Sequence, residues 1–219
     1  MVGGIASVPD LLRVLDLMGV CANALLGGAV ARRHGFDPVG FAALAIVSAL
    51  GGGLIRDTLL QHGTPVALTN YAYLTTALMA AGVAFLVRVE GRLWDRLFPL
   101  VDALALGCWA SAGAQKAIAL GLSWLPAILL GTVTAVGGGV VRDIAVGRIP
   151  TIFRGNTLYA TCAVIASLTL VLIQYLGHPH TGLLISTVVG AVLCLLARWR
   201  GWMLPENLAW RRNKPTKDQ

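Results

Sequence analysis

Long apolar segments separated by short polar stretches make up almost the whole chain. Each apolar segment holds about 20 residues, the length that crosses a hydrocarbon core roughly 30 Å thick. This pattern predicts an all-α membrane protein with seven transmembrane helices. The segments lie near residues 11–31, 38–60, 66–87, 97–119, 124–146, 157–176 and 182–198.

The composition agrees with this pattern. Of the 219 residues, 57% are hydrophobic and 12% are charged, whereas a soluble domain carries about a quarter charged residues. The net charge is +7 and the mean hydropathy is +0.76. Because the basic residues stand at the ends of the apolar segments and not on a soluble face, we expect no nucleic-acid partner.

The basic residues are distributed unequally between alternate loops. Loops after the first, third and fifth segments hold arginines, whereas the alternate loops hold His62, His178 and His180 but no Lys or Arg. Because Lys and Arg accumulate on the cytoplasmic side, we expect a multi-pass protein of the cell (inner) membrane. Its N-terminus is expected outside and its C-terminus in the cytoplasm, which requires an odd number of spans.

An internal repeat relates the two halves of the chain. A shift of 86 positions aligns "GGGLIRD" with "GGGVVRD", and also places Asp16 on Asp102 and Tyr73 on Tyr159. Each copy holds three spans, so the second copy enters the membrane from the opposite side. The sequence therefore predicts a 3+3 inverted repeat plus one C-terminal helix. We assign residues 10–88 to the first repeat, 96–176 to the second, 181–200 to the seventh helix and 201–219 to a basic cytoplasmic tail.

Each repeat carries three consecutive glycines inside its second span. Glycine costs about 1 kcal/mol relative to alanine in a helix interior, and three in succession favour an interrupted helix. Such a break is tolerated in lipid only beside protein or a water-filled cavity. Close helix packing on small residues is the alternative, but three successive positions cover nearly all faces of a helix. We therefore expect the second and fifth helices to break at Gly51, Gly52, Gly53, Gly137, Gly138 and Gly139.

Charged residues follow each triplet at the same offset, and charges inside spans indicate functional sites. From the direction of its span, the Arg56 and Asp57 pair belongs to the outer half of the membrane, as does Asp16. Each arginine is expected to pair with one of the two carboxylates in its own half, as a structural ion pair, as pore lining, or as both. The corresponding inner set is Arg142, Asp143 and Asp102.

Lys116 breaks the symmetry of the repeat, because its counterpart is Val30. It lies on the fourth span and reaches the outer half of the membrane. We consider it as a gate, as a counter-ion for Asp16 or Asp57, or as a ligand of a lipid headgroup. A lysine that extends to the interface from near a helix end is the structural alternative.

Other classes of site lack their defining residues. The chain has no GxxxxGK[ST], HExxH, CxxC or GxSxG motif. Its four cysteines fall inside apolar segments, where cysteine behaves as a small buried hydrophobe. We therefore expect neither enzymatic activity nor a metal site nor a bound cofactor, apart from permeant K⁺ or Na⁺ and a possible lipid.

The doubled GGGxxRD motif, together with "AQKAIALG" in the fourth span, resembles the prokaryotic members of the trimeric intracellular cation (TRIC) channel family. The resemblance covers residues 10 to about 200. It implies a homotrimer in which each subunit has its own pore between the two repeats and conducts monovalent cations, chiefly potassium. It also implies that the glycine triplets are kinks, and that Arg56, Asp57, Arg142 and Asp143 flank the path.

The same resemblance leaves two points open. Lys116 is similar to the lysine of a KEV motif that takes part in phosphoinositide binding in animal members, but Ala117 stands here in place of the glutamate. In addition, some bacterial relatives are described as glycine transporters. Inverted repeats and broken helices suit a carrier of a small amino acid as well as a channel, and a membrane protein without transport activity is the third reading.

Overall fold

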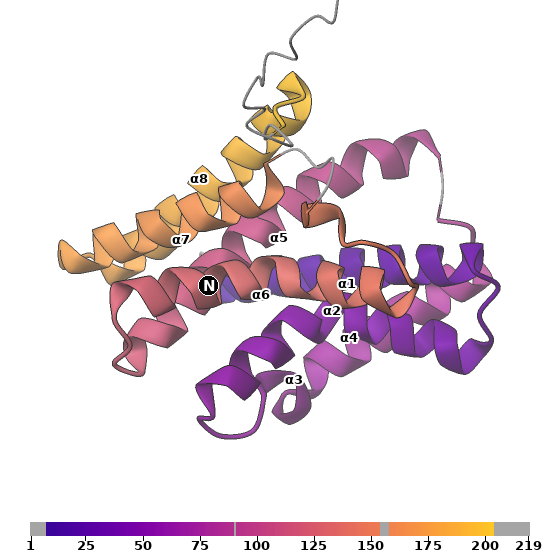
Figure 1. Ribbon diagram of the computed structural model, residues 1–219. Coiled ribbons are helices and arrows are strands. Elements are labelled where there is room, and N and C mark those ends of the chain that lie inside the picture. Colours follow the sequence, from indigo (N-terminus) through magenta and orange to yellow (C-terminus); the bar gives the residue numbers. More distant parts are fainter. Residues whose placement is uncertain (1–7, 90, 154–157, 204–219) are drawn as a thin grey trace, which may run out of the picture.

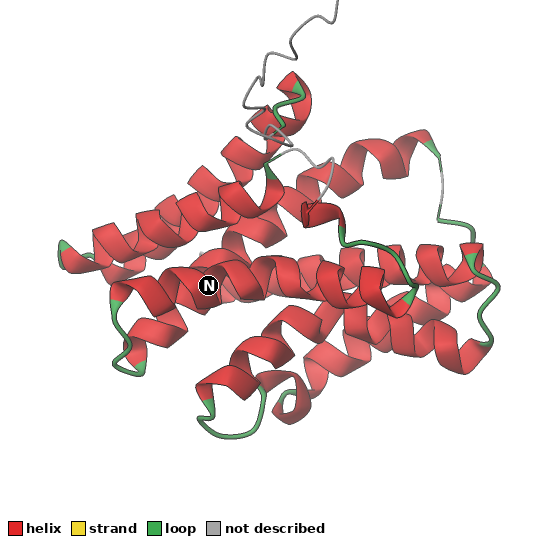
Figure 2. Cartoon of the chain, viewed as in Figure 1, coloured by secondary structure: helices red, strands yellow, loops and turns green. Residues whose placement is uncertain are grey.

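In the computed structural model, which describes residues 8–89, 91–153 and 158–203, the chain consists of helices joined by short loops (Figure 2). Figure 1 colours the chain from its N-terminus to its C-terminus and labels the α-helices. The helices are α1 (Val8–Arg33), α2 (Pro38–Leu60), α3 (Val66–Thr69), α4 (Tyr71–Leu86), α5 (Arg92–Ala119), α6 (Trp124–Ala145), the 3-10 helix η1 (Thr151–Phe153), α7 (Tyr159–Tyr175) and α8 (Pro179–Arg200).

The helices follow the predicted apolar segments, with differences in length. Within the described residues, five helices are long and apolar enough to cross a membrane: Arg13–Arg33, Pro38–Leu60, Arg92–Ala119, Trp124–Ala145 and Thr181–Arg200. The apolar helices α4 and α7 have only 16 and 17 residues, or about 24–26 Å at 1.5 Å per residue. That seven helices cross the membrane therefore stays a prediction.

The third predicted segment, 66–87, is divided at Asn70. The Asn70 side chain accepts a hydrogen bond from the Ala72 amide at 3.1 Å and so caps the start of α4. Asparagine is a preferred N-cap residue because its side chain satisfies an amide that has no partner within the helix. The short α3 precedes this cap, and the expected single helix is corrected to two.

The two repeats end their first helices in the same way. Gly35 after α1 and Gly121 after α5 are 86 positions apart and have φ of +66° and +82°. The amide of Phe36 bonds the carbonyl of Ala31 at 3.2 Å, a helix-ending pattern that requires a left-handed residue. The equivalent bond in the second half, from Leu122 to Ala117, is 3.1 Å long.

Each half of the molecule has an apolar core of its own. One buried cluster joins α1, α2 and α4, and another joins α5, α6, α7 and α8. Alanine is the commonest residue in both clusters, which allows the helices to pack closely. The halves meet where α2 packs on α6 and α1 packs on α5. α8 packs on α5 and α7, and Figure 1 shows it beside α7 at one end of the molecule. Of the predicted tail, 201–219, residues 204–219 lie outside the described residues.

Candidate functional site

A cavity of about 400 Å³ lies between the two halves, lined by residues of both. The sequence-predicted residues on its wall are Asp16, Gly52, Gly53, Arg56, Asp57, Asp102, Lys116, Gly138, Gly139 and Arg142. Gly51, Gly137 and Asp143 are not among the lining residues. We call Asp16, Arg56, Asp57 and Lys116 the first charge group, and Asp102, Arg142 and Asp143 the second charge group.

The glycine triplets lie where α2 crosses α6, beside this cavity. A Cβ on Gly52 would lie 2.1 Å from the carbonyl oxygen of Thr134, and a Cβ on Gly138 would lie 2.3 Å from that of Ser48. Both distances are far shorter than van der Waals contact, so a side chain at either position would force the helices apart. The contact is symmetric, because Ser48 and Thr134, like Gly52 and Gly138, are 86 positions apart.

The other glycines of each triplet face different neighbours. A Cβ on Gly51 would come within 3.2 Å of the Cα of Gly138, so the first glycine also faces the opposite helix. Beside Gly53, the nearest heavy atom outside its own helix backbone is a guanidinium nitrogen of Arg56, at 3.8 Å from such a Cβ. The equivalent distance from Gly139 to the guanidinium of Arg142 is 3.6 Å. The third glycine thus lies beside an arginine of its own helix, at an ordinary contact distance.

The predicted breaks at the triplets are wrong in this structure. α2 is one α-helix over Pro38–Leu60 and α6 is one α-helix over Trp124–Ala145, through all six glycines. The glycines are explained by the close crossing of the two backbones, which alanine would prevent. The cavity is therefore not opened by an unwound turn.

Asp57 holds together three segments around the first charge group. Its Oδ1 accepts hydrogen bonds from Arg56 Nε and Lys116 Nζ, each at 2.7 Å. Its Oδ2 accepts the amide of Val66 at 3.0 Å, which ties the loop after α2 to the helix end. Of the alternatives open for Lys116, the structure therefore supports a counter-ion for Asp57.

Asp143 makes the corresponding contacts in the second charge group. Its Oδ1 accepts two hydrogen bonds from Arg142, at 3.0 and 2.9 Å. Its Oδ2 accepts the amide of Thr151 at 3.0 Å and its hydroxyl at 3.3 Å. Each arginine thus pairs with the aspartate that follows it, and each aspartate fixes the next loop. Among the described residues no lysine joins this group, and Val30 occupies the position equivalent to Lys116.

Asp16 is bound in a different way. It accepts hydrogen bonds from the hydroxyl of Tyr73 and from Nε1 of Trp109, the latter at 2.6 Å. Within the described part of the chain, no Lys or Arg nitrogen lies within ion-pair distance of it. Its carboxylate is therefore held on the cavity wall by neutral donors.

Asp102 repeats this arrangement in the second half. The hydroxyl of Tyr159 donates to it at 3.0 Å, and Asn23, whose amide donates to the carbonyl of Gly19 at 3.2 Å, lies near it. Asn23 and Trp109 are 86 positions apart, so each carboxylate is contacted by an equivalent residue from the opposite repeat. Among the described ion pairs none includes Asp102 either.

Sequence reasoning did not single out the partners of these two carboxylates. Tyr73 and Tyr159 were visible as a matched pair in the repeat alignment, which was the available signal. Trp109 and Asn23 occupy equivalent positions but differ in type, so the alignment gave no reason to select them. Arg198 also lines the cavity, although the sequence places it among the basic residues at the end of the last span.

The sequence is similar to a family of membrane proteins. A family model described as "Glycine transporter" matches the chain twice, over residues 13–88 and 99–175. A UPF0126 membrane protein of Deinococcus radiodurans is 36% identical over 196 residues, 88% of this chain and 89% of that protein. The UPF0126 inner membrane protein YadS of Escherichia coli K12 is 32% identical over 185 residues, 84% of this chain and 88% of that protein.

The fold is similar to that of solved cation channels. A structure described in terms of conductance through TRIC cation channels matches with a TM-score of 0.84 and 33% identity, over 89% of this chain and 96% of that one. The TRIC trimeric intracellular cation channel orthologue of Rhodobacter sphaeroides matches with a TM-score of 0.75 and 30% identity, over 87% of this chain and 96% of that one. These neighbours are named as channels and not as enzymes.

Proposed function

The chain belongs to the family of bacterial TRIC-like membrane proteins named UPF0126, and we propose from this premise that it conducts potassium through the cavity between its repeats. The structural neighbours support a cation channel in general. Selectivity for potassium, one pore per subunit and the residues that carry the current are the parts that we propose.

The observation that carries this proposal is the pair of carboxylates, Asp16 and Asp102, that form no ion pair within the described residues. Asp57 and Asp143 are neutralised by arginine, whereas Asp16 and Asp102 accept hydrogen bonds from tyrosine and tryptophan. Both of these carboxylates lie on the cavity wall. Carboxylates that line a pore attract cations, so we assign Asp16 and Asp102 as the two stations of a permeant cation.

The spacing of the two stations follows from α5. Trp109, whose indole contacts Asp16, lies seven residues after Asp102 on the same helix, so the backbones of Trp109 and Asp102 are about 10 Å apart along the helix axis. A cation would move between them past the crossing of α2 and α6. Neutral donors on each carboxylate weaken its pull on the cation, which favours the weakly hydrated K⁺ over a strongly held smaller ion.

The setting of the channel is also part of the proposal. We propose a homotrimer in the cell (inner) membrane, with the N-terminus outside and the C-terminus in the cytoplasm. The trimer is supported by the name of the Rhodobacter sphaeroides neighbour, and the inner membrane by that of YadS. The partners are permeant monovalent cations and membrane lipids, with no resident cofactor.

Transport of glycine is the second candidate, and the description of the family model favours it. The cavity presents charges of both signs, as a zwitterion requires: Asp16 for an ammonium group and Lys116 for a carboxylate. Lys116 is already bonded to Asp57, however, so a substrate carboxylate would have to displace that contact. Cation conduction is the better supported function because the structural neighbours are cation channels.

Purified protein in planar bilayers under a potassium chloride gradient distinguishes the two functions. Unitary currents that reverse near the potassium equilibrium potential are expected for the channel. Electrically silent bilayers, combined with exchange of labelled glycine by the same preparation in liposomes, would overturn it in favour of the carrier. Empty bilayers and liposomes are the controls.

A further inference from the structure

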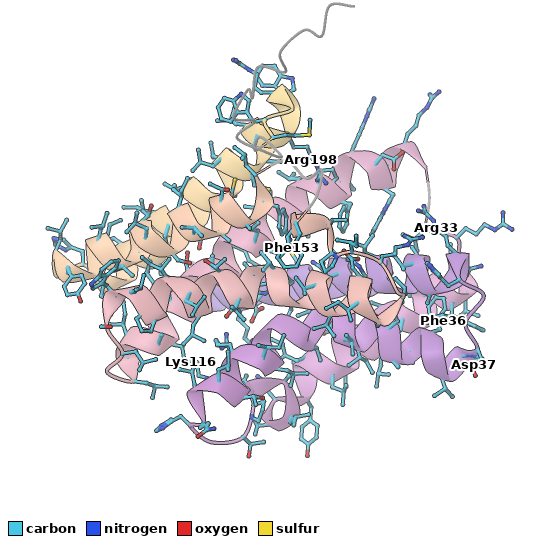
Figure 3. All side chains as sticks on the ribbon, in the orientation of Figure 1. Arg33, Phe36, Asp37, Lys116, Phe153 and Arg198 are labelled. Carbon is cyan, nitrogen blue, oxygen red and sulfur yellow. The ribbon has the colours of Figure 1, made fainter. Side chains whose placement is uncertain are left out.

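Arg198 brings a charge to the cavity from a helix that belongs to neither repeat. It lies in the last turn of α8 and lines the cavity with Cys194, which is four residues earlier on the same face of the helix. Figure 3 shows Arg198 between the end of α8 and the first turns of α5. The 86-residue repeat does not include it.

This arginine completes the charge of the second group. The first charge group has two cations, Arg56 and Lys116, for two carboxylates. The second has two carboxylates but only Arg142, since Val30 replaces the lysine. With Arg198 added, each charge group has two positive and two negative charges. The helix outside the repeats thus restores a balance that the repeat itself lacks.

Arg198 nevertheless differs from Lys116 in how it is held. Lys116 is fixed to Asp57 at 2.7 Å, whereas Arg198 makes no ion pair within the described residues. Arg198 is close enough to Asp102 to interact with it electrostatically. Arg198 is also exposed. A long side chain with a free guanidinium therefore stands beside an aspartate that has no cationic partner in contact.

The neighbouring residues hold the end of α8 at the membrane surface. Trp199 and Trp202 are exposed, and the guanidinium of Arg200 lies 5.1 Å from the ring centre of Trp199. Tryptophan and arginine near a helix end are typical of the membrane interface. The position of the Arg198 backbone is therefore set by the membrane, while its side chain is directed into the cavity.

We propose that Arg198 is a tethered cation that competes with the permeant cation for Asp102, and so limits the current at this end of the pathway. The inference rests on the proposed channel function. When the guanidinium approaches Asp102, it occupies the second cation station. When it moves away, a potassium ion takes its place. Arg198 is thus a residue that controls occupancy of the pore, and not a structural counter-ion.

Replacement of this arginine tests the proposal in planar bilayers. Arg198→Gln is expected to raise the unitary potassium conductance on the order of twofold at 0.05 M KCl, because one positive charge is removed from beside the station. The gain should fall away at 1 M KCl, where the Debye length is about 3 Å. Arg198→Lys should conduct like the parent protein. Arg200→Gln removes the arginine whose guanidinium lies over the Trp199 ring. It is the matched control and should leave the conductance unchanged.

A second variant keeps the test independent of folding. Arg198→Cys can be modified, after insertion into the bilayer, with methanethiosulfonate reagents that carry a positive or a negative group. The positive group should lower the conductance relative to the negative group, with the unsubstituted chain and its four cysteines as control. Equal conductance of the two adducts, or equal effects of Arg198→Gln and Arg200→Gln, would overturn the role of Arg198. Absence of current from the parent protein would instead reject the channel itself.

Discussion

Lys116 on α5 donates to Asp57 on α2 across the boundary between the repeats, with 2.7 Å between Nζ and Oδ1. Asp57 is buried, and it also bonds Arg56 and the amide of Val66. One carboxylate therefore joins two helices of different repeats and the start of α3. The second half has no equivalent link between repeats, because Asp143 bonds only Arg142 and Thr151 among the described residues.

Removal of this lysine is expected to destabilise the protein moderately. In Lys116→Met, Arg56 still neutralises Asp57, so we expect a loss of about 1–2 kcal/mol and not the larger cost of an unpaired buried charge. Thermal unfolding in detergent, followed by tryptophan fluorescence, measures the change. Arg92→Met, which removes an exposed cation, is the control. Equal unfolding temperatures for the two variants would contradict the assigned role of the Lys116 contact.

The crossing of α2 and α6 predicts opposite outcomes for adjacent glycines. Gly52→Ala would place a methyl group 2.1 Å from the carbonyl oxygen of Thr134. We expect the free energy of unfolding to fall by at least the roughly 1–3 kcal/mol typical of overpacking. We also expect the variant to lose its monodisperse profile in size-exclusion chromatography. Gly53→Ala meets only the flexible end of Arg56 at 3.8 Å and should be tolerated. Size-exclusion profiles and unfolding temperatures compare the two. A tolerated Gly52→Ala would show that the helices can separate.

The aspartates without an arginine partner and those paired with arginine are expected to respond differently to neutralisation. Asp16→Asn removes a proposed cation station and should lower potassium conductance by about three- to tenfold, with little loss of stability. Asp143→Asn leaves Arg142 without its counter-ion and should mainly lower the unfolding temperature. Unitary currents and unfolding curves on the same preparations separate these effects. Unchanged conductance in both Asp16→Asn and Asp102→Asn would remove these residues from the pore.

The tyrosine hydroxyls are expected to tune the cation stations. In Tyr159→Phe, Asp102 loses a donor, so its carboxylate binds a cation more strongly and favours the smaller ion. We expect the ratio of potassium to sodium permeability to fall, together with a stability loss of about 0.5–1.5 kcal/mol. Reversal potentials with potassium and sodium on opposite sides measure this ratio. The exposed Tyr71 provides Tyr71→Phe as a control, and an unchanged ratio in Tyr159→Phe would speak against the assignment.

The helices were well predicted because burial in lipid leaves a direct mark on the sequence. The range 38–60 agrees with α2 at both ends, where Asp37 caps the helix and Pro38 begins it. The third segment was less accurate, since the capping role of Asn70 is a local contact that hydropathy does not report. The repeat predicted that the Arg56–Asp57 and Arg142–Asp143 pairs are equivalent, and both pairs are bonded in the structure. Their depths in the membrane stay a prediction.

The glycine triplets were misinterpreted for a physical reason. Three successive glycines were expected to break the helix because packing against one partner uses one face. In the structure, two of them face the opposite helix and the third lies beside the arginine of its own helix. The sequence cannot distinguish these cases, since both remove side chains at the same positions. The tyrosine partners of Asp16 and Asp102 come from the same repeat as the carboxylate, 57 positions later in each case. Trp109 was missed because it comes from the other repeat, and the alignment of the repeats does not report which residues meet across them.

The crossing at Gly52 and Gly138 is self-complementary, because each helix contacts the other through equivalent residues of the repeat. A single three-helix chain with one such surface could therefore pair with a second copy of itself inserted upside down. Such a chain would have to insert into the membrane in both orientations, with equal numbers of molecules in each. The present protein is what gene duplication and fusion of that ancestor would produce, and its unequal residues, Lys116, Trp109 and Arg198, mark where the two halves have since diverged or gained a helix.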